Sequence, residues 1–226
     1  MLDNHKHHAA FMATVFSIHN YELLCKTVAW VYRAYYAHKF SFDYFPQELN
    51  AWKDAIKEHI TGTDVSTIQA IYSWMLANHE NFIAVSQSDV ELEMPVLADW
   101  ETVKSVFQTA LLHGDSTVCL NIALESIKDS DDVEQFYQQV IHPAMYEIGL
   151  LWEQGHISVA QEHLASAIVG RIMVAVSVVK RERKQRAGKI VVTSSPNKLH
   201  EIGAWMVSEI FELAGWEVRY LGANTP

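Results

Sequence analysis

Hydrophobic residues recur at helical spacing along the first third of the chain. Between residues 9 and 36 they predict one or two amphipathic helices, with an apolar face made of Phe11, Val15, Ile18, Leu24, Val28, Val31 and Tyr35. Further along, the pattern predicts a helix at 47–59, a helix at 65–85 and a polar linker at 86–95. We therefore expect an N-terminal helical domain over residues 1–90, whose role the pattern leaves open.

The helical pattern restarts at Asp99 and is interrupted by short polar turns. Residues that commonly cap helices, Asp115, Asp129 and Ser158, mark three of the expected helix starts. The expected helices are 99–112, 116–128, 132–153 and 159–181. Four helices of this length, joined by short loops, predict an antiparallel four-helix bundle over 99–184.

The period of the pattern changes after the basic connector RERKQRAGK. A short β-rich run, KIVVTSS, is followed by an amphipathic helix and a second strand, WEVRY, which predicts a β-α-β unit over 188–226. The fold class is therefore mainly α, with an α/β C-terminus that opens a Rossmann-like (flavodoxin-like) parallel sheet. Two strands cannot bury both faces of a sheet, so the unit is expected to be a truncated part of a larger domain.

Composition and charge exclude several classes of function. The net charge of −10 argues against direct nucleic-acid binding. Cys25 and Cys119 lie in apolar contexts far apart in the sequence and are expected to be reduced core thiols of a cytoplasmic protein. No run of about 18 apolar residues is present, so neither a membrane span nor a membrane partner is expected.

The stretch WEQGHISVAQEH combines side chains that suit a flat polar ligand. Trp152 precedes the Glu162–His163 pair by ten residues, across a predicted helix-turn-helix that lets both ends face a common site. An indole offers flat apolar area, and a carboxylate accepts hydrogen bonds from hydroxyl groups. The alternative is a core aromatic residue and an unrelated exposed polar pair.

A second candidate lies in the loop after the first strand, which reads LHEIG. Ligands of open α/β sheets bind at this carboxyl edge. His200 could supply a neutral imidazole to a transition metal, and Gly203 could let a bulky ligand approach the backbone. A surface histidine before a helix is the alternative.

Residues from about Val103 to Pro226 resemble cobalamin-binding modules that join a four-helix cap to a Rossmann-like domain. The resemblance rests on LLHGD, HPAMYEIGLLWEQGHISVAQEHLAS, LHEIG and GWEVRYLGANTP. It implies that His200 is the cobalt ligand, within a family signature Asp-x-His-x-x-Gly whose first position here is Lys198. The cofactor contacts that it implies are Trp152, Val159, Glu162, His163, Leu199, Glu201, Ile202 and Gly203.

The spacing Trp-x9-Glu-His resembles the subgroup that binds adenosylcobalamin and senses light. This implies a light-responsive sensor or regulatory protein, rather than an enzyme, that acts through a protein partner or a homo-oligomer. One alternative is a corrinoid methyl carrier of a methyltransferase system, although the bulk of Trp152 argues against partner access. The other is a degenerate module that binds heme or a bilin.

The N-terminal domain carries histidine and aromatic residues that the implied function does not explain. His5, His7 and His8 are expected in a mobile terminus rather than in a metal site. The many aromatic residues of this domain are expected to form a core, with a partner surface or a second chromophore pocket as alternatives.

Overall fold

The computed structural model describes residues 2–62, 65–88, 94–179, 188–194 and 201–223. The chain divides into two compact units. Unit 1 comprises Met1–Glu91 with Glu153–Gly155, and unit 2 comprises Leu92–Trp152 with His156–Pro226.

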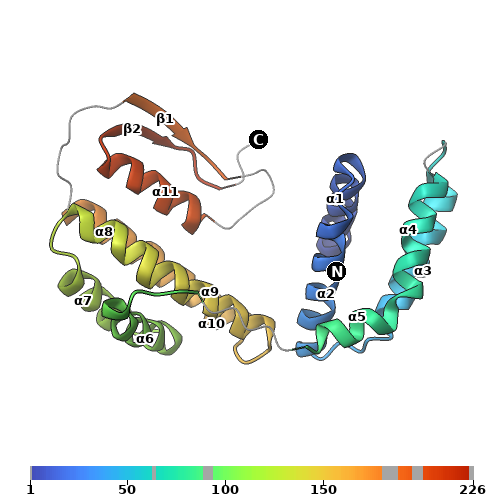
Figure 1. Cartoon of the computed structure of the whole chain (residues 1–226), viewed down its shortest axis with the longest axis horizontal. Helices are drawn as coiled ribbons and strands as arrows, with labels where there is room; N and C mark the ends of the chain where they lie inside the picture. Colours follow the sequence, from blue (N-terminus) through green and yellow to red (C-terminus); the bar gives the residue numbers. More distant parts are fainter. Residues whose placement is uncertain (1, 63–64, 89–93, 180–187, 195–200, 224–226) are drawn as a thin grey trace. The chain divides into compact units, whose positions relative to one another are not determined.

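Unit 1 is built from helices in its described part (Figure 1): α1 (Leu2–Ile18), α2 (Tyr21–Ala37), α3 (Tyr44–His59), α4 (Val65–Ala77) and α5 (His79–Ser86). The break between α1 and α2 is set by Asn20, whose side chain accepts the backbone N–H of Leu23. The prediction of one helix over 65–85 is wrong at Asn78. There the backbone of Asn78 adopts φ −102° and ψ +15°, outside the α-helical region, so α4 ends at Ala77 and α5 begins at His79.

Two further expectations for unit 1 are also wrong. The histidine-rich terminus lies within α1, and His8 Nε2 lies 2.8 Å from the hydroxyl of Tyr72, so tertiary contacts hold it in place. Cys25 is an exposed free thiol because it lies on the outer face of α2, whereas Cys119 is buried as expected. The apolar sequence around Cys25 belongs to the opposite, core-facing side of the same helix, which includes Leu24 and Val28.

The helices of unit 2 that precede the sheet are α6 (Ala98–His113), α7 (Ser116–Ser126), α8 (Ser130–Phe136), the π-helix η1 (Tyr137–Ile141), α9 (His142–Glu153) and α10 (Val159–Val179). Their expected caps are confirmed. Asp115 accepts the N–H of Val118, Asp129 and Asp132 form a capping box, and the Ser158 hydroxyl accepts the N–H of Gln161. Local side-chain chemistry therefore sets these helix starts.

The single helix expected over 132–153 is instead three segments with a π-helical turn in the middle. Pro143 has no N–H to offer the carbonyl of Gln139, and its ring would clash with that carbonyl in a regular α-helix. A wider turn before the proline relieves this conflict.

Helix α10 is the central core helix of unit 2. Its window Val159–Ser177, with mean hydropathy 1.3, is long and apolar enough to cross a membrane by length and composition alone, and no other helix of the described residues is. Core helices of soluble bundles share this property. Six side chains of α10 are buried in the core of unit 2: Ala165, Ile168, Val169, Ile172, Met173 and Val176.

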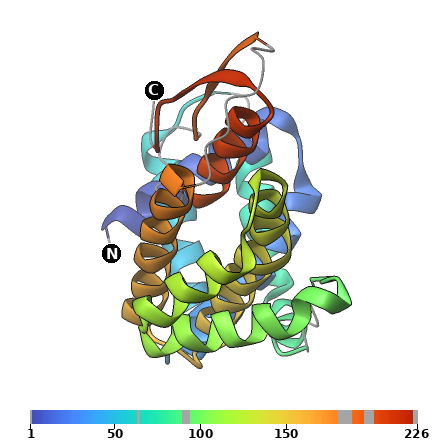
Figure 2. The same cartoon turned by 90° about the vertical axis from the view of Figure 1, so that its left-hand side faces the viewer.

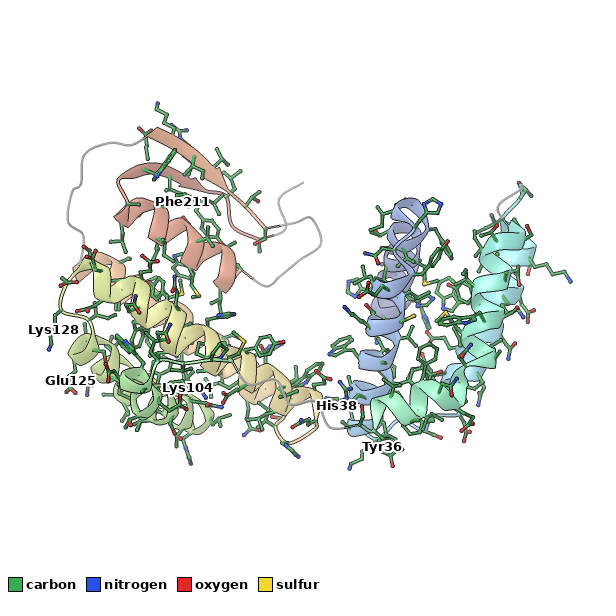
Figure 3. The ribbon with its side chains drawn as sticks, viewed as in Figure 1. Tyr36, His38, Lys104, Glu125, Lys128 and Phe211 are labelled. Carbon is green, nitrogen blue, oxygen red and sulfur yellow. The ribbon has the colours of Figure 1, made fainter. Side chains whose placement is uncertain are left out.

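The C-terminal part is a β-α-β unit of β1 (Gly188–Val192), α11 (Ile202–Leu213) and β2 (Trp216–Tyr220). The strands are parallel, with Gly188 opposite Trp216 and Val192 opposite Tyr220. Helix α11 lies between this small sheet and the helices of unit 2 (Figures 1 and 2). Phe211 points from α11 toward the strands (Figure 3), and its ring meets that of Trp216 edge-on. A mainly helical chain with a two-stranded parallel sheet at its C-terminus is thus confirmed, whereas a complete Rossmann-like domain stays a prediction.

Candidate functional site

The turn between α9 and α10 places the residues of the WEQGHISVAQEH stretch. Trp152 is half-buried in the last turn of α9. The backbone N–H of His156 returns to the carbonyl of Leu151 at 2.9 Å, and Gly155 adopts φ +72°, which favours glycine. The Ser158 and Gln161 side chains then cap α10 reciprocally. This turn starts α10 seven residues after Trp152.

Val159, Glu162 and His163 lie on one face of the first turns of α10, since they are three and four residues apart. Val159 and His163 are exposed, whereas the side chain of Glu162 is only 17% exposed. The Glu162 carboxylate lies 2.6 Å from His163 Nδ1 and accepts a hydrogen bond from the Ser166 hydroxyl at 3.1 Å. These two contacts fix the orientation of the carboxylate group. They therefore also fix the directions from which it can accept further hydrogen bonds.

The other predicted site residues lie at the N-terminal end of α11, beside the carboxyl end of β1. Leu199 and His200 lie outside the described residues, as does Lys198, so the predicted cobalt ligand stays a prediction. Glu201 is exposed, and its carbonyl accepts the hydroxyl of Tyr220 at 3.3 Å. Ile202 packs against the helical core of unit 2. A side chain at Gly203 would meet no atom within 4 Å, so the space beside it is open.

The structure therefore brings Glu162 and His163 into direct contact and anchors Ile202 on the helices. Trp152 and Gly203 come from other elements, α9 and α11. That all of these residues face one ligand stays a prediction.

Sequence reasoning missed the contact that holds α11 against the helices. Glu209 is buried, and it accepts hydrogen bonds from the hydroxyl of Tyr137 in η1 and from the indole N–H of Trp205 at 2.9 Å. The ring of Trp205 lies over Gly170 of α10, where a β-carbon would come within 3.5 Å of it. The one feature of the sequence that could have indicated this contact is a carboxylate four residues after a tryptophan, on an otherwise apolar face of the helix.

We expect Tyr137→Phe to destabilise the docking of α11 by about 1–3 kcal/mol, because a buried carboxylate loses a hydrogen-bond donor. Burial and the neighbouring Glu209 both raise the pKa of Tyr137, so its hydroxyl stays protonated and donates at physiological pH. The measurement is amide hydrogen exchange of residues 202–213. Tyr146→Phe, at an exposed position, is the matched control. Equal exchange in both variants would contradict the role of Tyr137.

Known proteins resemble parts of this chain. A family model described as "B12 binding domain" matches residues 106–176. The chain is 24% identical over 141 residues to trimethylamine corrinoid protein 1 of Methanosarcina mazei, in an alignment that covers 58% of this chain and 62% of that protein.

Two solved structures are also similar to this chain. One is a monomethylamine corrinoid protein of Methanosarcina barkeri, with TM-score 0.48 and 15% identity over 56% of this chain and 59% of the other. The second is a methanol:cobalamin methyltransferase complex of Methanosarcina barkeri, with TM-score 0.31 and 14% identity over 74% of this chain and 62% of the other. The chain thus spans less than two thirds of the length of the relatives it matches.

The family match runs from within α6 to the last turn of α10, and it contains Trp152, Val159, Glu162 and His163. These helices share one core, from Phe107 of α6 to Val176 of α10. Over residues 106–176 this chain is therefore similar to the B12 binding domain family.

Proposed function

We propose that unit 2 binds a corrinoid between its helices and its β-α-β unit. The family match over residues 106–176 is the observation that carries this proposal. The residues of the structure fit such a ligand. The apolar side chain of Val159 is exposed on α10, and the space beside Gly203 on α11 is open. A large planar ligand would cover both.

The proposed roles of the side chains follow from their chemistry. Trp152 would lie against the flat face of the ligand, and the Glu162 carboxylate, oriented by His163 and Ser166, would accept hydrogen bonds from its polar groups. His200 would bind the cobalt. Lys198 cannot accept a hydrogen bond from that imidazole as the family's Asp does, which lowers its expected donor strength.

A methyl carrier of a methyltransferase system is the more specific function that we propose first. A bound corrinoid supplies a cobalt atom that accepts and releases a methyl group. The similarity to a trimethylamine corrinoid protein supports this function, and it implies a methyltransferase as the protein partner. The chain itself would then hold and present the corrinoid in the cytoplasm rather than catalyse a reaction alone.

A light-responsive regulator that holds adenosylcobalamin is the second candidate. The spacing from Trp152 to the Glu162–His163 pair favours it, together with the direct contact within that pair. A bulky indole beside the upper face of the ligand would protect an adenosyl group but obstruct a partner enzyme.

The test is a visible absorption spectrum after incubation with hydroxocobalamin, methylcobalamin or adenosylcobalamin and desalting. We expect a retained corrinoid, and retention about tenfold to a hundredfold weaker in Glu162→Gln, from a lost charge-assisted hydrogen bond of about 1.5–3 kcal/mol. Glu125→Gln, at an exposed position of α7 (Figure 3), is the matched control and should bind normally. His200→Ala should change the spectrum of the bound corrinoid, whereas His113→Ala should not.

The same samples distinguish the two candidates when their assembly state is measured by size-exclusion chromatography before and after green illumination. A change in assembly that occurs only with adenosylcobalamin would favour the light-responsive regulator. Retention without such a change would favour the carrier. If no corrinoid is retained, both candidates fail, and heme and bilin would be tried next.

A further inference from the structure

Unit 1 holds a carboxylate among aromatic rings, at a place that the corrinoid proposal does not involve. Tyr44, Glu48 and Trp52 are spaced four residues apart and therefore share one face of α3. Together with His5 of α1 they line a surface pocket of about 440 Å³. Among the described residues that line this pocket there is no Lys or Arg.

A smaller cavity of about 70 Å³ adjoins this pocket, because Glu48 lines both. Its walls are mainly apolar, with His8, Tyr32 and Phe45 among them. The ring of His8 lies against that of Trp52, with 4.9 Å between ring centroids. The inner side of the surface pocket is therefore an aromatic wall.

The charge of this region comes from Glu48. Its side chain is 19% exposed, and Oε1 lies 3.2 Å from His5 Nδ1. Burial raises the pKa of Tyr44 to about 12, with Glu48 adding to the shift, so this hydroxyl stays neutral. Burial lowers the pKa of His8 to about 4, so its imidazole is uncharged at neutral pH. The pocket thus presents the Glu48 carboxylate beside the neutral aromatic rings of Tyr44 and Trp52.

We propose that this pocket binds a small organic cation of the methylated or quaternary ammonium class. The Glu48 carboxylate would balance the charge, and the rings of Tyr44 and Trp52 would contact the methyl groups through cation–π attraction. A metal ion fits less well, since the described residues contain no group of three His, Cys, Asp or Glu side chains that could hold one. A neutral apolar ligand would bring no positive charge to balance the Glu48 carboxylate, which itself lies beside His5.

Choline and its uncharged isostere 3,3-dimethyl-1-butanol are the probes that test this proposal. They are titrated into the full chain, without corrinoid, at pH 8. Binding is followed by calorimetry and by the indole N–H signal of Trp52. We expect choline to bind at least about tenfold more tightly than the alcohol, and to shift the Trp52 signal.

Two matched pairs of variants locate the site. Glu48→Gln, which keeps the side-chain shape, should weaken choline binding at least about tenfold, whereas Glu58→Gln, on an exposed part of the same helix, should not change it. Trp52→Leu should weaken binding, and Trp30→Leu, at an exposed position, should not. The proposal is overturned if choline does not bind, if the alcohol binds as tightly, or if Glu48→Gln binds like the wild type. An unchanged Trp74 indole signal shows that each variant has folded.

Discussion

Phe136→Ala is expected to destabilise unit 2 by about 3–5 kcal/mol, the usual cost of removing a buried phenylalanine ring. Phe136 is fully buried where α8 passes into the π-helix. Its ring meets Phe107 of α6 edge-on, with 5.4 Å between centroids, and Trp100 at 6.4 Å. Removing the ring takes away both contacts and leaves a cavity between α6 and α8 in the core of unit 2.

The measurement is urea unfolding followed by the indole N–H signals of Trp100 and Trp205, which report unit 2 separately from unit 1. Tyr146→Ala is the matched control, because its ring is 42% exposed and its loss should change the free energy of unfolding by about 0.5 kcal/mol or less. A similar loss of unfolding free energy in the two variants would show that Phe136 is not part of the core. Corrinoid retention should fall in Phe136→Ala under conditions where unit 2 unfolds.

Lowering the pH from 7 to 4 is expected to destabilise unit 1 by roughly 3 kcal/mol through His8 alone. Burial, and next the charge of His5, lower the pKa of His8 from 6.5 to about 4 in the folded chain. Below pH 6.5 the unfolded chain therefore binds a proton that the folded chain does not. The contribution of His8 to the free energy of unfolding of unit 1 is fully present above pH 6.5. It is lost as the pH falls to about 4.

This prediction is checked by urea unfolding at pH 7, 5.5 and 4, read from the indole signals of Trp52 and Trp74 in unit 1. His8→Gln should remove most of the pH dependence in this range, because glutamine has no proton to gain. His7→Gln, at an exposed position, should behave like the wild type. A variant His8→Gln with the full wild-type pH dependence would exclude His8 as its source.

The helices and most of their ends were determined by the sequence alone. Apolar spacing predicts the helices, and the caps at Asp115, Asp129 and Ser158 act within one turn of the residues they bind. The β-α-β unit was likewise predicted, since the change from period 3.6 to short β-rich runs is local. The similarity of residues 106–176 to the B12 binding domain family agrees with the resemblance predicted from the sequence, because Trp152, Glu162 and His163 are close together in the chain.

Only the tertiary structure decided how these elements are held and what their polar groups do. The Glu209 carboxylate accepts a hydrogen bond from Tyr137, which lies 72 residues away in the sequence. No local sequence pattern could therefore have indicated this contact. The half-buried imidazole of His8 contacts Tyr72, 64 residues away in the sequence, and its lowered pKa keeps it neutral at pH 7, whereas the sequence predicted a mobile terminus. Local propensity acts over a few residues, whereas burial and long-range hydrogen bonds depend on which helix faces meet. The sequence therefore determined most of the helices and the strands, and the packing of α1, α3 and α11 decided the contacts of His8 and Glu209.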